Sequence, residues 1–381
     1  MRKIALLLEN SREYGREMVR GIADFYQTRR DTELEMVEAD DILRPGALKD
    51  YDGIIARVVT RRECAALRAA RIPVVDVLCQ YDDTGFLRAD SDHRTIGEMA
   101  ADYFLGCGFR AFAFFGFAGA AFSEARLAGY AGRLRALGHA CSVFRADRID
   151  RASIYAERTQ AVRHPGPLLR WLRGLPRQTA LFCANDIRAY QALRLAAEAG
   201  ITVPGDLAVL GVDNDPLVCA FAKPQLSSID PAAHEVGRAA AKLLHAAIRG
   251  GAEPGTSVAP PPRGIVARAS AVFRHDGPPW FQAALDYIHA NPDRHVSTAD
   301  LVRLTGLSHT SVEKAFRRHL GESAGRYILR LKMTEARRLL ALGGVSCKEV
   351  AYRIGFASPQ YFCRVFRRYF GRAPFAPKRR R

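Results

Sequence analysis

The sequence predicts a chain of two parts, a two-lobed α/β domain followed by an all-α domain that contains two helix-turn-helix units. Three observations support this prediction. Short apolar runs alternate with amphipathic helical stretches over roughly the first 270 residues, which is the pattern of helices packed around a mostly parallel sheet. A helix, a short turn and a second helix occur twice near the end of the chain. Positive charge is concentrated in that same region.

The more distinctive helix-turn-helix unit covers residues 345–370, VSCKEVAYRIGFASPQYFCRVFRRYF. Ser346 precedes Glu349 by three residues, which is the spacing of a capping box at a helix start, and a glycine ends that helix. Ser358 and Pro359 then begin the second helix, because a capping hydroxyl followed by proline is a common helix start. Phenylalanines repeat on the inner face of this helix. Its outer face presents Gln360, Tyr361, Arg364, Arg367 and Arg368.

The same pattern occurs earlier, with helices at 298–305 and 309–320. Leu301, Val302 and Leu304 are expected to face inward in the first of these helices. The second presents outward Thr310, Ser311, Glu313, Lys314 and Arg317. Residues 324–342 form one predicted helix between the units, about 25–30 Å long at ~1.5 Å per residue. This is close to the ~34 Å turn of B-DNA, so the two recognition helices would enter successive major grooves.

The outward side chains divide by the DNA group that they suit. Base edges are recognised by amides, hydroxyls and guanidinium groups, and arginine pairs best with guanine. The predicted base-edge contacts are Thr310, Glu313, Lys314, Gln360, Tyr361 and Arg364, with Ser311 on the same face. The predicted phosphate contacts are Arg317, Arg318, Arg367 and Arg368.

The distribution of charge supports a nucleic-acid partner. The chain has 57 basic and 40 acidic residues, a net charge of +17. Residues 276–381 carry 20 of the basic and 8 of the acidic side chains, whereas the first 275 carry 37 and 32. A basic domain joined to a nearly balanced one is what binding to a phosphate backbone requires. Charge alone is equally typical of a well-solvated surface, so the prediction depends on its coincidence with the duplicated helix-turn-helix.

The C-terminal region resembles the AraC family of transcription regulators. The run GFASPQYFCRVFRRYFGRAP is similar to the signature of that family, and LSHTSVEKAFRRHLGESAGRYILRLKMTEARRLL is similar to its first helix-turn-helix and linker helix. The resemblance covers about residues 280–374 and implies a regulator that binds double-stranded promoter DNA and acts on RNA polymerase. After Pro374 the sequence departs from the usual ending and finishes in a basic tail, 378–381.

The first 270 residues contain more α/β units than one small sheet accommodates, which favours two lobes with a cleft between them. Strands are expected at 3–8, 34–37, 53–56, 74–78, 112–115, 180–183 and 207–212. Helices are expected at 16–28, 64–70, 95–106, 126–137, 166–173, 187–199 and 233–248. In open α/β sheets, ligands bind beyond the carboxyl ends of the strands.

Several polar side chains fall at those strand ends. They are Asn10, Asp92, Arg126, Asn185, Asp186 and Asp213, with Asp90 beside them. Each one alone is as typical of a helix cap or a turn. Carboxylates, amides and a guanidinium gathered at one cleft are the groups that bind sugar hydroxyls, because each forms two directional hydrogen bonds. We therefore predict a sugar-binding site.

The same region resembles the effector domain of the LacI/GalR regulators, which has the periplasmic sugar-binding-protein fold. The segments LFCANDIRAYQALRLAAEAGITVPGDLAVLGVDND and SEARLAGY carry the resemblance, which extends over about residues 1–270. It implies that Arg126, Asp213 and one of Asn185 or Asp186 contact the sugar, with Asp92 also placed there, and that the protein is a homodimer. Unlike those regulators, this chain has no DNA-binding helices before its first strand.

A LacI-type sensor at 1–270, a linker at 271–279 and an AraC-type domain at 280–381 is the arrangement of the xylose-operon activators. This domain order implies D-xylose as the effector. Two alternatives remain open at this point: a regulator of another sugar or small metabolite, and an enzyme-like α/β domain with an accessory DNA-binding tail. The motifs G-x-G-x-x-G, P-loop and G-x-S-x-G are absent from the sequence, which favours a binding protein over an enzyme.

Neither a metal nor a cofactor is expected. The eight cysteines are scattered, without the C-x-x-C spacing of zinc sites or a disulfide framework. This usage indicates a reducing cytoplasm. No run of apolar residues approaches the ~20 needed to span a bilayer, so no membrane contact is expected.

Overall fold

The computed structural model describes residues 1–29, 31–44, 46–148, 165–253, 255–272, 278–291, 296–342, 345–370 and 373–374. It separates the chain into two compact units. The first contains residues 1–101 and 111–271, and the second contains residues 102–110 and 272–381. The predicted basic tail at 378–381 and residues 273–277 of the predicted linker lie outside the described residues.

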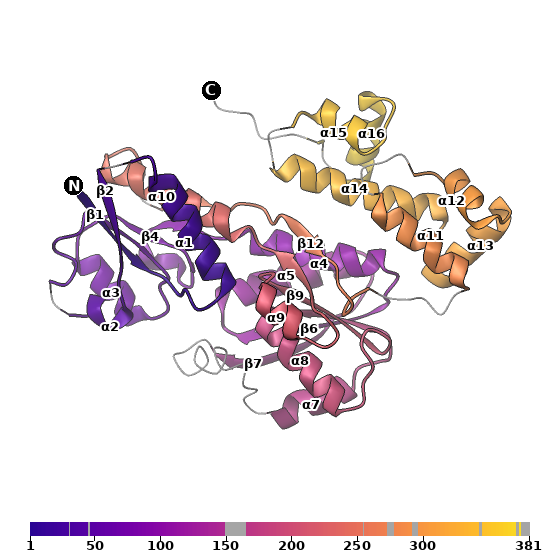
Figure 1. Ribbon diagram of the computed structural model, residues 1–381, viewed down its shortest axis with the longest axis horizontal. Coiled ribbons are helices and arrows are strands. Elements are labelled where there is room, and N and C mark those ends of the chain that lie inside the picture. The colour runs from indigo at the N-terminus through magenta and orange to yellow at the C-terminus, as the bar shows by residue number, and fades with distance from the viewer. Residues whose placement is uncertain are drawn as a thin grey trace. The chain divides into compact units, whose positions relative to one another are not determined.

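The first unit is built on two six-stranded sheets (Figure 1). Sheet 1 has the strand order β11-β5-β4-β3-β1-β2, and all its neighbouring strands are parallel. Its strands are β1 (Arg2–Leu7), β2 (Thr32–Met36), β3 (Gly53–Ala56), β4 (Val74–Asp76), β5 (Leu87–Ala89) and β11 (Ser257–Val258). The helices of this lobe are α1 (Glu13–Tyr26), α2 (Ala39–Ile42), α3 (Arg61–Ala69) and α10 (Ala233–Ile248), with a short 3₁₀ turn at Asp82–Thr84.

The side chains of β1 alternate between the two faces of sheet 1. Ile4 and Leu6 pack under α1 and α10, which lie side by side in Figure 1. Ala5 and Leu7 face the opposite side, where α3 packs. Helices α1 and α10 approach closely because each has a glycine at the crossing: a Cβ at Gly21 would lie 2.0 Å from the carbonyl oxygen of His234.

Sheet 2 has the order β12-β10-β9-β8-β6-β7. It is parallel except for its edge strand β12, which runs antiparallel to β10. Its strands are β6 (Ala111–Ala118), β7 (Ser142–Arg148), β8 (Thr179–Cys183), β9 (Leu207–Val212), β10 (Ser227–Asp230) and β12 (Gly264–Val266). The helices that accompany it are α4 (His93–Gly106), α5 (Ala121–Arg135), α7 (Pro165–Arg173), α8 (Asp186–Glu198) and α9 (Pro216–Phe221).

Within the described residues, the chain passes between the two sheets after β5, after β10 and after β11. The three connecting segments are hydrogen-bonded to one another. The Ser91 hydroxyl donates to the carbonyl oxygen of Pro231 at 3.0 Å, and the Asp92 amide donates to the carbonyl oxygen of Pro260 at 3.1 Å. The lobes are therefore joined by three adjacent backbone segments, which form a hinge.

The predicted two-lobed α/β architecture is confirmed, and each of the seven predicted strands lies within a strand of the structure or overlaps one. The prediction missed β5, β7, β10, β11 and β12. Three of these strands are very short, with three residues in β5, two in β11 and three in β12. β7 (SVFRADR) is an edge strand whose apolar residues alternate with charged ones, so its hydrophobic signal is weak.

The second unit contains α11 (Pro279–Ala290), α12 (Thr298–Thr305), α13 (His309–Leu320), α14 (Ala324–Leu342), α15 (Cys347–Arg353) and α16 (Pro359–Phe370). Helix α14 takes part in two apolar cores. Its Tyr327 and Ile328 pack with α11, α12 and α13, whereas its Met333 and Ala336 pack with α15 and α16. The predicted linker helix is confirmed, and it forms the shared wall of both helix-turn-helix units.

The predicted helix starts in this unit are also confirmed. Ser346 and Glu349 form a reciprocal capping box at α15, and the Ser358 hydroxyl accepts from the Tyr361 amide at 3.3 Å. The prediction that Leu304 faces inward is wrong, since 47% of its surface is exposed. No helix within the described ranges is long and apolar enough to cross a membrane.

Candidate functional site

A pocket opens between the two lobes of the first unit, at the carboxyl ends of strands from both sheets. Sheet 1 and α1 contribute Leu8, Glu9, Arg12, Tyr14, Gly15, Met18, Arg57, Val77, Leu78 and Asp90. The other lobe contributes His93, Phe122, Arg126, Asn185 and Asp213. The pocket thus has the location that the topology predicts for a ligand site.

Arg126 is held rigidly at the wall of this pocket. It lies on α5 with only 3% of its surface exposed, and its Nη1 donates to the carbonyl oxygen of Ala184. Helices α4 and α5 pack at very short range, since a Cβ at Gly97 would lie 2.0 Å from the carbonyl oxygen of Arg126. Among the described residues, Nε of Arg126 is buried without a hydrogen-bond partner. A buried guanidinium N–H with this geometry can donate to a ligand oxygen.

Asp213 and Asn185 follow neighbouring strands of sheet 2. Asp213 comes directly after β9 and has a φ of 116°, in the region that non-glycine residues rarely adopt. The turn is fixed by the next residue: Arg268 donates from Nη2 to Oδ1 of Asn214 at 2.9 Å. Asn185 follows β8 and caps α8, accepting from the Arg188 amide at 2.9 Å. Both pocket side chains are therefore positioned by backbone features of the sheet edge.

Tyr14, Asp90 and His93 form a polar cluster at the pocket wall near the hinge. The Tyr14 hydroxyl donates to Oδ1 of Asp90 at 3.3 Å, and Nε2 of His93 lies 3.1 Å from Oδ2 of Asp90. Burial, with a further contribution from Asp90, raises the pKa of Tyr14 above its ordinary value, so its phenol stays neutral at physiological pH. Tyr14 and His93 were not predicted as site residues from the sequence, although both lie within four residues of predicted ones.

Three predicted site residues do not line this pocket. Asn10 is exposed, and its carbonyl oxygen accepts from Arg16 at 3.4 Å. Asp92 caps α4, accepting from the Thr95 amide at 3.0 Å and from the Thr95 hydroxyl at 2.7 Å. The third, Asp186, is deeply buried. The structure therefore places Asn185 rather than Asp186 at the pocket.

Asp186 is part of the core that supports the pocket. It is 1% exposed and accepts from the Ser228 hydroxyl at 2.5 Å and from the Asp215 amide at 2.9 Å. Only glycine leaves room for this carboxylate, because a Cβ at Gly211 would lie 2.1 Å from Oδ1. Burial, followed by the nearby Asp213 carboxylate, raises the pKa of Asp186 well above its usual range.

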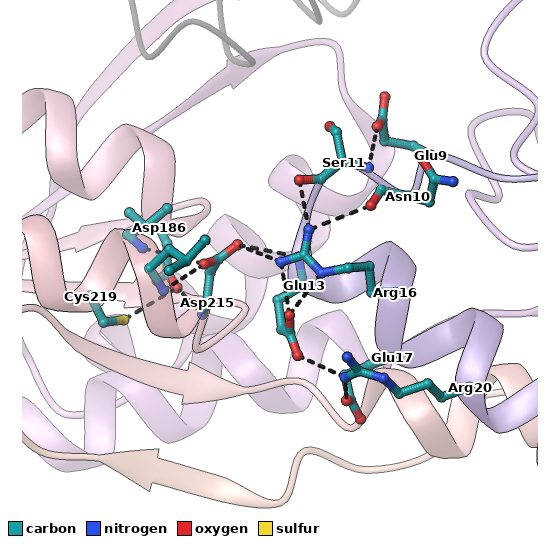
Figure 2. Close-up of polar contacts among 12 residues, drawn as sticks. Glu9, Asn10, Ser11, Glu13, Arg16, Glu17, Arg20, Asp186, Asp215 and Cys219 are labelled. Atoms are coloured by element: carbon teal, nitrogen blue, oxygen red, sulfur yellow. Dashed lines mark hydrogen bonds and ion pairs between the residues drawn. The ribbon is translucent and has the colours of Figure 1, made fainter.

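Asp215 connects the two lobes (Figure 2). Its Oδ1 caps α9, accepting from the Leu217 amide at 3.0 Å. Its Oδ2 accepts from the Glu13 amide at the start of α1 at 3.2 Å and lies 3.9 Å from Nη2 of Arg16. Figure 2 shows Arg16 directed at both Glu13 and Asp215. One carboxylate thus contacts helices from both lobes, two residues after Asp213.

The lining of the pocket is balanced in charge. Three arginines (Arg12, Arg57 and Arg126) are matched by three carboxylates (Glu9, Asp90 and Asp213). Aromatic and aliphatic side chains form the rest of the wall, among them Phe122, Met18 and Leu78. A ligand with many hydroxyl groups and an apolar C–H face satisfies both kinds of surface.

The second unit exposes most of the predicted DNA contacts. On α13 the exposed residues are Thr310, Ser311, Lys314, Arg317 and Arg318, and on α16 they are Gln360, Tyr361, Arg364, Arg367 and Arg368. Glu313 is only partly exposed, and its Oε2 accepts from the Ala324 amide at 3.3 Å. This contact places Glu313 at the start of α14 as a cap. The guanidinium of Arg364 lies over the Tyr361 ring, 5.2 Å from its centroid.

An inter-lobe pocket joined to two helix-turn-helix units defines a class: a DNA-binding transcription regulator with a two-lobed sensor domain. Comparisons with known proteins agree. Residues 3–89 match the family described as the XylR N-terminal domain, residues 101–271 match the periplasmic binding protein-like domain, and residues 301–380 match a helix-turn-helix domain. Both resemblances drawn from the sequence are thereby confirmed.

The chain is similar over nearly its full length to xylose operon regulatory proteins. It is 26% identical to that of Haemophilus influenzae, covering 98% of this chain and 97% of the relative. It is 27% identical to that of Escherichia coli K12, covering 98% and 95%. A solved structure described as the xylose-binding transcription activator XylR superposes with a TM-score of 0.61 at 25% identity, covering 98% of this chain and 96% of that one.

Proposed function

We propose that the protein is a dimeric transcription activator that binds D-xylose between the lobes of its sensor. The observation that carries this proposal is the pocket itself, where Arg126, Asn185 and Asp213 converge beside an apolar wall. Similarity along nearly the whole chain to regulators of xylose operons supports xylose as the sugar. The balanced charge of the pocket favours a neutral sugar over a sugar phosphate.

In this proposal Arg126 donates to ring or hydroxyl oxygens, and Asp213 and Asp90 accept from hydroxyl groups. Asn185 does both, because an amide is donor and acceptor. Phe122 packs against the apolar face of the sugar. His93 and Tyr14 hold the Asp90 carboxylate in place.

Sugar binding acts on DNA through a change of population. The sugar contacts both lobes, so it stabilises the closed sensor and alters how two protomers place their DNA-binding units. A ligand that binds one conformation about 100-fold better shifts the equilibrium by roughly 2.7 kcal/mol. Arg364, Gln360 and Lys314 contact base edges, and Arg317, Arg318, Arg367 and Arg368 contact phosphates. The regulator works in the cytoplasm, where it meets promoter DNA and RNA polymerase.

The deciding experiment is a thermal-shift screen of the full chain against D-xylose, L-arabinose, D-ribose, D-glucose and their phosphates. A sugar at 100 times its Kd adds about 2.7 kcal/mol to the stability of the sensor, which raises its melting temperature by several degrees. D-xylose is expected to produce this rise. Arg126→Ala should abolish it, whereas Arg20→Ala, an exposed arginine of α1, should not. A rise with another sugar alone would replace xylose as the effector, and no rise with any sugar would remove the sensor assignment.

A further inference from the structure

Two cysteines meet in the second helix-turn-helix unit. Cys347 is the first residue of α15, and Cys363 lies in the middle of α16. Their sulfur atoms are 3.4 Å apart. All eight cysteines of the chain are free thiols, so the two sulfurs touch without a covalent bond.

Both thiols are at the edge of an apolar core, where they remain accessible. They pack against the cluster that contains Val350, Phe362 and Phe366, and each is partly exposed. The helices that carry them are anchored at their starts by the Ser346 and Ser358 hydroxyls. A small oxidant can therefore reach the sulfur atoms while the surrounding fold keeps them together.

The geometry is close to that of a disulfide. An S–S bond is about 2.05 Å long, so the two sulfurs need to approach by roughly 1.4 Å, which small rotations about the Cα–Cβ bonds and a small shift of the helices provide. Burial raises the pKa of Cys347 to about 11, with a smaller contribution from its contact with Cys363. Cys347 is thus mostly a protonated thiol at neutral pH, and it must lose its proton as its sulfur attacks.

We propose that Cys347 and Cys363 are a reversible oxidation site. The disulfide that forms there links α15 to α16 and weakens DNA binding by α16. The oxidant is a hydroperoxide such as hydrogen peroxide. The functional part of this inference rests on the proposed DNA-binding role of α16, whereas the disulfide chemistry does not.

The reaction balances with one peroxide per disulfide. The Cys363 thiolate attacks a peroxide oxygen, the O–O bond breaks, and the departing hydroxide takes up a proton to give water. Cys363 is then a sulfenic acid. The Cys347 sulfur attacks it, the S–S bond forms as the S–O bond breaks, and the Cys347 proton leaves with the oxygen as a second water. Together the two thiols lose two electrons to the peroxide, and a dithiol reductant converts the disulfide back to two thiols.

The disulfide acts on the residues that face DNA because Cys363 directly precedes Arg364. Drawing α16 toward α15 displaces the outer face of α16, on which Gln360 and Arg364 are exposed. Loss of one well-aligned base contact reduces affinity about tenfold. Closing a loop of about 16 residues also restricts the unfolded chain. The second helix-turn-helix unit should therefore melt several degrees higher when oxidised than when reduced.

The experiment uses the full chain, first reduced and then treated with hydrogen peroxide. Tryptic mass spectrometry reports the bond, and affinity is measured for a duplex that the reduced protein enriches from a random-sequence pool. Cys347→Ser and Cys363→Ser remove the site. Cys141→Ser, which alters a partly exposed cysteine of the sensor, is the matched control.

The expected result is a cross-linked pair of peptides containing Cys347 and Cys363, an affinity about tenfold lower, and full recovery with dithiothreitol. Both site variants should keep the reduced affinity after peroxide, and Cys141→Ser should respond as wild type. Absence of the cross-link overturns the oxidation site. A cross-link with unchanged affinity overturns the switch. Failure of the reduced protein to enrich any duplex overturns the proposed function instead, and the switch with it, while the mass spectrum still decides the chemistry.

Discussion

The backbone amide of Glu13, at the first turn of α1, donates to the carboxylate of Asp215, at the start of α9, over 3.2 Å. The two residues are 202 positions apart and belong to different lobes. Asp215 follows the pocket residue Asp213 by one intervening residue. The same short loop therefore carries a ligand-facing side chain and a contact that exists only when the lobes are together.

Asp215→Asn is expected to weaken effector binding about fivefold. Asparagine caps helices as well as aspartate does, so α9 should remain intact, but the charge beside the Glu13 amide and Arg16 is lost. A hydrogen bond to a charged group contributes about 1.5–3 kcal/mol, and the neutral replacement retains part of it. Titration calorimetry with D-xylose measures the change.

Asp24→Asn is the matched control for this variant. Asp24 is on α1, the helix of Glu13, and its carboxylate lies 2.8 Å from Nε2 of His234, but that contact lies within one lobe. The Asp24→Asn protein should bind D-xylose with the affinity of the wild type. Equal affinities for all three proteins would show that the contact between Glu13 and Asp215 does not help to hold the closed sensor.

Asp213→Ala and Asp186→Ala should have opposite effects. Asp213 lines the pocket, so its loss should abolish the xylose-dependent rise in melting temperature. Asp186 satisfies buried donors of Ser228 and Asp215, so its loss should lower the unfolding free energy by about 1–3 kcal/mol. The rise with xylose should persist in the folded Asp186→Ala protein. The reverse pattern would place Asp186, not Asp213, at the sugar.

The sensor should lose stability relative to its Asp186→Asn variant as pH rises from about 4. An unfolded aspartate ionises near pH 3.9, whereas burial and Asp213 raise the pKa of Asp186 in the folded protein. Between these values the folded state binds more protons than the unfolded state, so the slope of unfolding free energy against pH is negative, at most about 1.4 kcal/mol per pH unit. Urea unfolding at pH 4.5, 5.5 and 6.5 measures the difference between the two proteins. A difference that does not vary with pH would mean that Asp186 ionises normally.

Arg364→Ala and Arg367→Ala should weaken DNA binding in different ways. Loss of a base contact at Arg364 should cost about 1–3 kcal/mol at one base pair and relax the preference there. Loss of a phosphate contact at Arg367 should weaken binding to all duplexes and reduce the slope of log affinity against log salt by about 0.9. Binding isotherms on single-base variants of the enriched duplex, at several salt concentrations, distinguish the two. Identical changes for both variants would contradict the division into base and phosphate contacts.

Local patterns account for what could be predicted from the sequence. The capping box at Ser346 and Glu349, the phenylalanine stripe of α16 and the apolar run of β9 each depend on residues within a few positions. The predicted strand ends also placed Arg126, Asn185 and Asp213 at one cleft. These features needed no knowledge of distant contacts.

Contacts between distant segments account for most of what was missed. Asp92 and His93 are adjacent, and only the close packing of the hinge places His93 in the pocket while Asp92 caps α4. Helical periodicity places Glu313 on an outer face, but in the structure its carboxylate accepts from the Ala324 amide. Cys347 and Cys363 are 16 residues apart and give no motif. Such pairings depend on how helices pack, which periodicity does not encode.

The packing of α10 on β1 and α1 determines when the first lobe can fold during synthesis. Ile4, Leu6 and Ile22 share one core with Val236 and Leu244, and the edge strand β11 pairs with β5 only at Ser257 and Val258. A nascent chain has therefore made five of the six strands of its first sheet before α10, which covers them, leaves the ribosome. The N-terminal lobe must wait with a partly uncovered apolar face while the more than 140 residues between Ala89 and Ala233 are translated, and it completes its core only after most of the second sheet has been made.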